Sequence, residues 1–457
     1  GVCMARVVIM ALTAGGGHKS AMYSIARALH EYAPALEVEC FESRVNTIDE
    51  VHRISYSSFE TLYDALYKAS DIEVVQDVSS AVFAKTIIKN FMDEYRPYIA
   101  NKDIQVIIST HFAQTHAMLR LRAEMNAPTK IVAYIPDFDD SSVHFADYKG
   151  VRPDAAIAQS PRFLAKLHRR FGVPRYALQQ AGFITKPEFS AVRSLTKQEA
   201  LRQVMNLPFD GVANLYPEKR TFVAAGGSFW VSEIYRDIRE LCLNGAFCWD
   251  NVQILVVCGQ NSEAYQAYRA LHEELTLRNS AVRIVPLPFM SAEQLALVYR
   301  ASNAVMLSGI APATLYELIE TQAGQPVIRR INPGPERYNL KYIVERKLAI
   351  PALTQEEFLA HMSTFSRLSH ILDESNYAFS QAAEHERTLA RRRAQNMALF
   401  IEYLATTHTL PQHHRKQRYG FGSAFIRNLA KSGVASEYFA ALWSRSASRM
   451  RHLPSKQ

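Results

Sequence analysis

The sequence predicts an α/β protein of two facing Rossmann-like domains with a cleft between them, followed by a helical C-terminal tail. Short runs rich in Val and Ile alternate with helical patterns, as in parallel strands that are buried on both faces. This alternation occurs twice along the 457 residues, and each series opens with an apolar run and a glycine turn, "ALTAGGGHKS" and "VAAGGSFW". Two consecutive βαβ series of similar size indicate two domains of the same class.

The first series occupies residues 1–190 and is expected to form the N-terminal domain. The stretch after its glycine turn predicts a helix, and two amphipathic helices are expected over about 48–100. Residues 191–218 contain one helical pattern and then polar, Pro- and Gly-bearing sequence, which indicates a linker. The predicted strands are "RVVIMAL", "LEVECFES", "IQVIIST", "KIVAYIPD" and "AAIAQS".

The second series occupies residues 219–350 and is expected to form the C-terminal domain. Residues 351–410 are helical in pattern and are expected to pack back toward the first domain, and residues 411–457 form a basic tail with aromatic residues. The predicted strands lie in "TFVAAGGSF", "VQILVVCGQN", "VRIVPLPFM", "SNAVMLSGI" and "QPVIRRINPGPE", with a helix in "TLYELIETQA".

Composition excludes several classes of protein. Apolar residues make up 48% and charged residues 21%, which are globular values. No apolar stretch reaches the roughly 18–20 residues of a membrane span, and the first residues do not resemble a signal peptide. The five cysteines lack CxxC spacing, so we expect reduced thiols in a cytoplasmic protein and no zinc site.

The glycine turn at Gly15, Gly16 and Gly17 does not form a nucleotide-binding P-loop. That motif needs Gly directly before the Lys and another five residues earlier, whereas His18 and Thr13 stand at these positions. Glycine after a strand instead lets a ligand approach the backbone at the start of a helix. His18, expected to be the first residue of that helix, is either a general base, a positioning donor or a surface histidine.

The second series carries more candidate binding residues, all near expected carboxyl ends of strands. A carboxylate in the first turn of the helix after "LSGIAPA" suits two ribose hydroxyls, with a diphosphate on the helix N-terminus. A Pro-Gly loop, "NPGPERYN", adds polar groups that can form hydrogen bonds with sugar hydroxyls. The candidates are Gly226, Gly227, Ser228, Gly259, Gln260, Phe289, Met290, Ser308, Gly309, Thr314, Glu317, Gly334, Glu336 and Asn339.

The order of these segments resembles the monogalactosyldiacylglycerol synthase family and, more distantly, the N-acetylglucosaminyltransferase that makes the peptidoglycan lipid intermediate. The resemblance covers about residues 5–350 and includes "GGGHKSA", "THFAQTHA", "IPDFDDSSVHFADYKGVRPDAAIAQS", "GGSF", "VVCGQN" and "PGPERYNLKYIVE". It implies a GT-B enzyme with a nucleotide sugar in the C-terminal domain and a lipid acceptor in the N-terminal one. The implied reaction is inverting, metal-independent hexose transfer from a UDP-sugar to a lipid hydroxyl such as diacylglycerol, with no cofactor.

The resemblance also implies roles for matching residues. Asp137 is the expected catalytic base with His18 as its partner or alternative, and His111 lies with Gly15–Gly17 on the acceptor side. Glu317 matches the ribose-binding glutamate, and Glu336 matches the acid of the Pro-Gly loop. The chain departs from the family at Pro335, where a Gln is usual, in the glycine-poorer "SGIAPAT", and in two residues apparently inserted between Glu317 and Pro326.

Three other hypotheses about the function remain open. Asp137 and Asp139 form a D-x-D pair, as used by GT-A transferases to hold Mn²⁺ or Mg²⁺. A sugar-nucleotide 2-epimerase shares the two-domain fold, and a degenerate, non-catalytic protein could bind nucleotide sugars at a membrane. "HHRKQR" is more simply a solvated linker than a nucleic-acid site, because no nucleic-acid-binding motif accompanies it.

The net charge of +8 is concentrated in the tail. From Arg387 to Gln457 there are 13 Lys and Arg against two acids, so the preceding residues sum to about −3. A diacylglycerol acceptor stays in the bilayer, so we expect a cytoplasmic enzyme held peripherally on an anionic membrane by this tail. The tail offers the basic residues Arg415, Lys416, Arg418, Arg427, Lys431, Arg445, Arg449 and Arg451, and among them stand the aromatic or apolar residues Tyr419, Phe421, Phe425, Tyr438, Phe439, Leu442 and Trp443.

Overall fold

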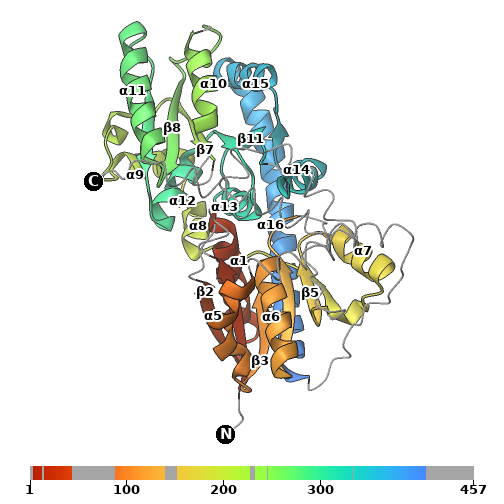
Figure 1. Ribbon diagram of the computed structural model, residues 1–457. Helices are drawn as coiled ribbons and strands as arrows, with labels where there is room; N and C mark the ends of the chain where they lie inside the picture. The colour runs from red at the N-terminus through yellow and green to blue at the C-terminus, as the bar shows by residue number, and fades with distance from the viewer. Residues whose placement is uncertain are drawn as a thin grey trace, which may run out of the picture. The chain divides into compact units, whose positions relative to one another are not determined.

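A computed structural model describes residues 4–12, 15–43, 88–138, 152–226, 232–243, 245–332 and 334–407 (Figure 1). The chain forms two compact units, each built on its own six-stranded parallel sheet. The predicted α/β class and the presence of two separate βαβ sheets are therefore confirmed. One unit contains residues up to Pro136, residues 140–181 and the residues from Asn396 onward, and the other contains Asp137–Asp139 and Gly182–Gln395.

The first sheet has the order β2-β1-β3-β4-β5-β6. Its inner strands β1, β3, β4 and β5 are mostly buried, whereas the edge strands β2 and β6 are partly exposed. Helices α5 and α6 pack together over β1, β3 and β4 (Figure 1). The strands are β1 (Ala5–Leu12), β2 (Leu36–Ser43), β3 (Ile104–Ser109), β4 (Lys130–Ile135), β5 (Ala155–Ala158) and β6 (Leu178–Gln180). The helices are α1 (Gly15–Tyr32), α5 (Ile88–Ala100), α6 (Phe112–Met125) and α7 (Pro161–Phe171).

The second sheet has the order β12-β11-β10-β7-β8-β9. Its strands are β7 (Arg220–Ala225), β8 (Val252–Gly259), β9 (Ile284–Pro288), β10 (Ala304–Ser308), β11 (Gln325–Arg330) and β12 (Ile350–Pro351). The helices are α8 (Pro187–Ala191), α9 (Lys197–Met205), α10 (Ser232–Leu243), α11 (Ser262–Arg278), α12 (Ala292–Ala301), α13 (Pro312–Glu320), α14 (Glu336–Glu345), α15 (Gln355–Arg367) and α16 (Ser369–Thr406).

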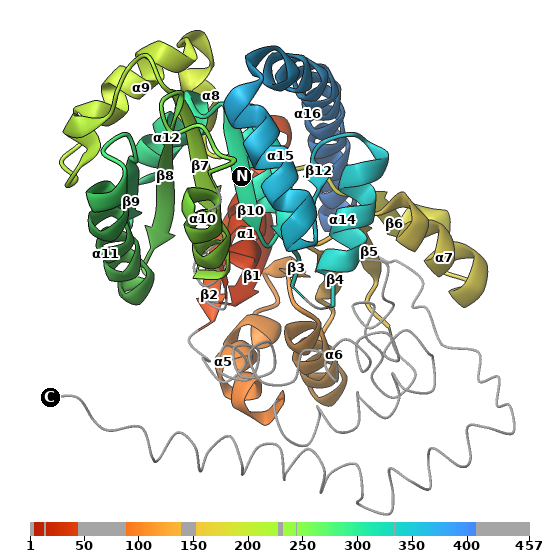
Figure 2. The same ribbon diagram turned by 90° about the horizontal axis from the view of Figure 1, so that it is seen from above.

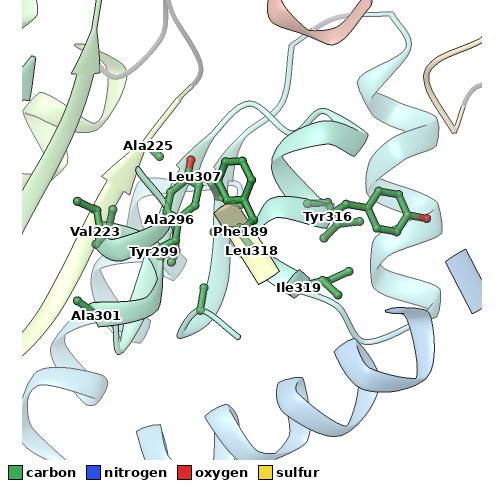
Figure 3. Packing of buried hydrophobic residues seen from close by; sticks show 14 of the residues in the cluster. Phe189, Val223, Ala225, Ala296, Tyr299, Ala301, Leu307, Tyr316, Leu318 and Ile319 are labelled. Atoms are coloured by element: carbon green, nitrogen blue, oxygen red, sulfur yellow. The ribbon is translucent and has the colours of Figure 1, made fainter. Parts of the chain in front are cut away.

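Two hydrophobic cores cover the two faces of this second sheet. Figure 2 shows α10 and α11 on one side of β7–β9 and α8, α9 and α12 on the other. Alternate residues of β7 enter the two cores: Phe222 packs with α10, α11 and α15, whereas Val223 packs with α9, α12 and α13. Figure 3 shows part of the latter core, with Tyr316 at one end and its hydroxyl pointing away from Leu307. This packing fixes the positions of the loops that follow the strands.

Residues 191–218, which the composition suggested as a linker, lie in the second unit. They contain α9, and Leu201, Val204 and Val212 are buried in the core beneath β7. The second unit begins at Gly182, eight residues before the predicted domain end at 190. The last helix, α16, runs from the second unit into the first, where Lys130 Nζ donates hydrogen bonds to the carbonyls of Leu404 and Thr407.

Candidate functional site

In each unit the chain order reverses direction across the sheet at one point. In the first sheet β1 and β3 lie side by side, and in the second β7 and β10 do, although neither pair is consecutive in its series. Ligands of open α/β sheets bind beyond the carboxyl ends of the strands at such a switch point. Gly15–His18 and Thr110–His111 follow the strands of the first pair. Gly226 follows β7 of the second pair, and Ser308 is the last residue of β10, with Gly309 directly after it.

His18 is half-buried at the switch point of the first unit. It is the fourth residue of α1, so the prediction that it is the first helical residue is wrong, because Gly15, Gly16 and Gly17 already form the first turn. Its Nδ1 lies 2.9 Å from the carbonyl oxygen of Thr110. Because a carbonyl only accepts, Nδ1 carries the hydrogen, and in the neutral ring the lone pair is on Nε2. This tautomer gives His18 the acceptor nitrogen that a general base requires.

His111 has the opposite tautomer. It caps α6, and its Nδ1 accepts a hydrogen bond from the Ala113 amide at 3.1 Å, so its hydrogen is on Nε2 when the ring is neutral. The His18 and His111 rings meet edge to face, with centroids 5.1 Å apart. The structure thus brings together two histidines that the sequence singled out, and in the neutral rings Nε2 is an acceptor in His18 and carries the hydrogen in His111.

Glu336 is the central charged residue of the second unit's switch point. Its carboxylate accepts hydrogen bonds from the Asn332 amide at 2.7 Å, from Asn332 Nδ2 at 2.9 Å and from the Ile310 amide at 3.0 Å. Burial raises the pKa of Glu336 to about 7, and the negative charge of nearby Asp137 adds to this rise. The three hydrogen bonds favour the charged form and oppose the rise. The carboxylate therefore joins the loop after β10 to the start of α14.

Asp137 belongs to the second unit although it follows β4 of the first in the chain. Asn339 Nδ2 donates to Asp137 Oδ1 at 3.0 Å and to the Ile310 carbonyl at 2.9 Å, and its Oδ1 accepts from the Phe138 amide at 2.8 Å. Asn339 is fully buried, and these three bonds use its amide. Asn339 therefore holds the Asp137 carboxylate in place. The expected contact between Asn339 and sugar hydroxyls stays a prediction.

The loop between β10 and α13 provides backbone donors. Gly309 has φ +97°, a backbone conformation that favours glycine, and a Cβ there would lie 3.1 Å from Asn332 Nδ2, which is a tight contact. Ala311 caps α13 without a side-chain hydrogen bond, and the Ser308 hydroxyl is buried with no hydrogen-bond partner among the described residues. A buried hydroxyl and an uncapped helix start beside each other suit an anionic group.

Glu317 lies in the second turn of α13, not the first as predicted, and Thr314 lies within the helix rather than before it. Both shifts arise because α13 begins at Pro312. Burial raises the pKa of Glu317 to about 7, and Lys186 opposes this rise. Within the described part of the chain, no hydrogen bond reaches this carboxylate. A half-buried acid that accepts no hydrogen bond from the described residues is a candidate for ligand binding.

The remaining donor-side candidates follow other strands. Gly259 ends β8 with φ +57°, and Gln260 after it is exposed. Phe289 is 67% exposed after β9, whereas Met290 is buried in the core with α12 and α13. Gly226 is buried after β7, and Gly334, with φ +88°, precedes α14. Gly227 and Ser228 lie outside the described residues.

Sequence reasoning missed Asn332 and Lys186. Asn332 begins the segment "NPGPERYN", so its position was visible, but its bonds to Glu336 require a folded loop. Glu336 and Asn339 belong to the first turn of α14, not to a loop as predicted, because the helix starts directly after Pro335. Proline tolerates this place because it needs no amide donor there.

In the described ranges no three His, Cys, Asp or Glu residues are grouped to hold a metal ion. Asp139, the second acid of the D-x-D pair, lies outside these ranges. Among the described helices, none is both long and apolar enough to cross a bilayer.

No protein-family model and no curated protein matches the chain. Solved structures do match. One is described as trehalose-6-phosphate from E. coli bound with UDP-2-fluoro glucose; it is 12% identical, with 88% of this chain and 99% of that one covered and a TM-score of 0.54. Another is α,α-trehalose 6-phosphate synthase from Burkholderia multivorans, at 12% identity, 88% and 98% coverage and a TM-score of 0.51. These likenesses show the fold: the chain has the GT-B fold.

Proposed function

We propose that the protein is an inverting glycosyltransferase that moves a hexose from a UDP-sugar to a lipid hydroxyl, with diacylglycerol as the acceptor. The observation that carries the proposal is the cluster of Asp137, Asn339 and Glu336 beside the start of α13. In this cluster a hydrogen-bonded carboxylate lies beside a helix N-terminus, at the point where the strand order of the sheet reverses. A carboxylate can act as a base, and a helix N-terminus can stabilise a departing diphosphate. The E. coli protein of similar fold holds UDP-2-fluoro glucose.

The donor binds in the second unit in this proposal. The diphosphate contacts the glycine turn Gly226–Ser228 and the segment Ser308–Thr314, which runs from the end of β10 into the first turn of α13, where amides and the α13 dipole favour negative charge. Glu317 accepts hydrogen bonds from the two ribose hydroxyls. Gln260, Phe289 and the backbone near Gly259 line the base, and Glu336 contacts the hexose.

Asp137 takes the proton from the acceptor hydroxyl as its oxygen attacks the anomeric carbon. The new carbon–oxygen bond forms on one face while the bond to the UDP oxygen breaks on the other, so UDP leaves with the electron pair and the anomeric configuration inverts. The α13 N-terminus and loop amides stabilise the departing diphosphate, so the reaction needs no cofactor or metal. His18 Nε2 serves as the partner or alternative base.

The direct test is product formation from UDP-galactose, UDP-glucose or UDP-N-acetylglucosamine with diacylglycerol in mixed micelles. A glycolipid of inverted anomeric configuration, formed equally with and without EDTA, supports the proposal. Activity that EDTA abolishes and Mn²⁺ restores would favour the metal-dependent D-x-D reading. An epimer formed from UDP-N-acetylglucosamine alone would favour the epimerase, and UDP binding with no turnover would favour a non-catalytic binding protein.

We further propose that the acceptor is reached at the membrane surface through residues 411–457, which lie outside the described residues. Basic residues near an anionic leaflet contribute about 1 kcal/mol each. We expect removal of residues 411–457 to release the protein from anionic vesicles in a sedimentation assay, and raised salt to weaken binding of the intact chain. Equal binding of the truncated protein would show that the membrane contact lies elsewhere.

A further inference from the structure

One buried carboxylate outside the proposed site connects two of its elements. Glu386 lies in the part of α16 that belongs to the second unit, and its side chain is 2% exposed. Its Oε1 accepts hydrogen bonds from Tyr342 Oη at 2.7 Å, Tyr316 Oη at 3.0 Å and Arg393 Nη1 at 3.2 Å. Its Oε2 lies 3.5 Å from Arg346 Nε. A buried charge requires such compensation, and the charge in turn orients its partners.

The first branch of this network leads to Asp137. The ring of Tyr342 stacks on Phe138 with centroids 3.7 Å apart and planes 8° apart. Phe138 follows Asp137 directly, and its amide is hydrogen-bonded to Asn339, which lies one turn before Tyr342 on α14. Arg346 covers the Tyr342 ring at 3.7 Å, and Arg393 Nη1 donates to the Tyr342 hydroxyl at 3.0 Å. The carboxylate of Glu386 therefore fixes the ring against which Asp137's neighbour packs.

The second branch leads to α13. Tyr316 directly precedes Glu317, and its ring stacks on Phe183 with centroids 5.2 Å apart. Figure 3 shows its hydroxyl extending beyond the core cluster, and there it meets Glu386. One carboxylate thus holds the helix that carries Glu317 and the helix that carries Glu336 and Asn339.

We propose that Glu386 is a positioning residue that fixes Asp137 and the starts of α13 and α14 in their working arrangement. Its effect on catalysis rests on the proposed function, whereas its effect on local order does not. The two are measured separately: hydrogen exchange reports on the arrangement without any ligand, and transfer kinetics report on its consequence.

The variant for the test is Glu386→Gln, which preserves volume. An amide oxygen accepts two hydrogen bonds, whereas Oε1 of Glu386 accepts three, and the new NH₂ group would face either Arg346 or the tyrosine and Arg393 donors. The matched control is Glu384→Gln on the same helix, where the side chain is 51% exposed and pairs with Arg193 and Arg387. Tyr342→Phe is a milder second variant that keeps the ring on Phe138 and removes the hydroxyl.

Two amides report on the arrangement: Phe138 N–H, bonded to Asn339, and Ile310 N–H, bonded to Glu336. We expect both to exchange about tenfold faster in Glu386→Gln, and Phe138 N–H to exchange faster in Tyr342→Phe. The Ile254 amide, bonded to the Arg283 carbonyl, should not change, and Glu384→Gln should match the parent at all three. Unchanged exchange at Phe138 and Ile310, or equal acceleration at Ile254, would overturn the proposal.

The kinetic arm asks whether the arrangement matters for transfer. A displacement of about 1 Å at a reacting group costs about 10²-fold, so we expect kcat to fall 10- to 100-fold in Glu386→Gln with a smaller change in the KM for the UDP-sugar. Faster local exchange with an unchanged kcat would keep Glu386 as a positioning residue but remove Asp137 from the proposed chemistry. A KM change alone, with kcat unaltered, would likewise count against a link to Asp137.

Discussion

Replacing Asp137 by Asn is expected to lower transfer by about 10²–10⁴-fold, the range that a positioned general base contributes. An amide cannot take the acceptor's proton. It still offers an oxygen to Asn339 Nδ2, so the hydrogen bond now seen at 3.0 Å can persist. The fold and the affinity for UDP should therefore be spared. Single-turnover kinetics would measure the chemical step, and calorimetry would measure UDP affinity.

The control for this variant is Asp210→Asn, which makes the same chemical change at a side chain that is 81% exposed. It should transfer at the parental rate. If Asp137→Asn also transfers at close to that rate, Asp137 is not the base, and His18→Gln becomes the next variant to measure. If a variant that transfers more slowly also has a lower melting temperature than the parent, the slower rate reflects a change in folding rather than the loss of a base.

Glu317→Ala is expected to weaken UDP binding by ten- to over a hundredfold. Losing hydrogen bonds to a charged group costs about 1.5–3 kcal/mol, and every 1.4 kcal/mol is about a tenfold change in affinity. Because Glu317 has no hydrogen bond from the described residues, the variant leaves no protein donor unpaired there. Glu293→Ala, at an exposed acid on α12, is the control and should bind UDP as the parent does. Unaltered affinity in Glu317→Ala would place the ribose elsewhere.

The pKa of Glu317, raised by burial to about 7, adds a pH signature. Below about pH 7 the carboxyl is protonated in the free protein, so UDP affinity should rise as the pH increases through 7. Comparison with Glu317→Gln at each pH removes the contribution of UDP's own ionisation. Since the folded-state pKa lies above the ordinary value of 4.5, the stability contributed by the protonated form is lost as the pH rises from about 4.5 through 7. Glu317→Gln should lack this loss.

The sequence alone determined the fold class. Runs such as "VVIMAL" in β1 and "VQILVVCG" in β8 are almost wholly apolar, and their alternation with helical patterns is typical of parallel strands that helices cover on both faces. The glycine turns after β1 and β10 could also be predicted from the sequence, because a backbone that passes directly from a strand into a helix favours glycine at the turn. These signals involve residues close together in the chain, so one sequence is enough to detect them.

The tertiary structure decided how the site is assembled. Asn339 and Asp137 are 202 positions apart, and no local pattern indicates that one amide bonds both Asp137 and the loop after β10. The same holds for Glu386. The helical pattern around it does not indicate that two buried tyrosine hydroxyls donate hydrogen bonds to its carboxylate. Propensity and periodicity describe neighbours along the chain, whereas a buried hydrogen-bond network depends on which distant segments the packing of the two cores brings into contact.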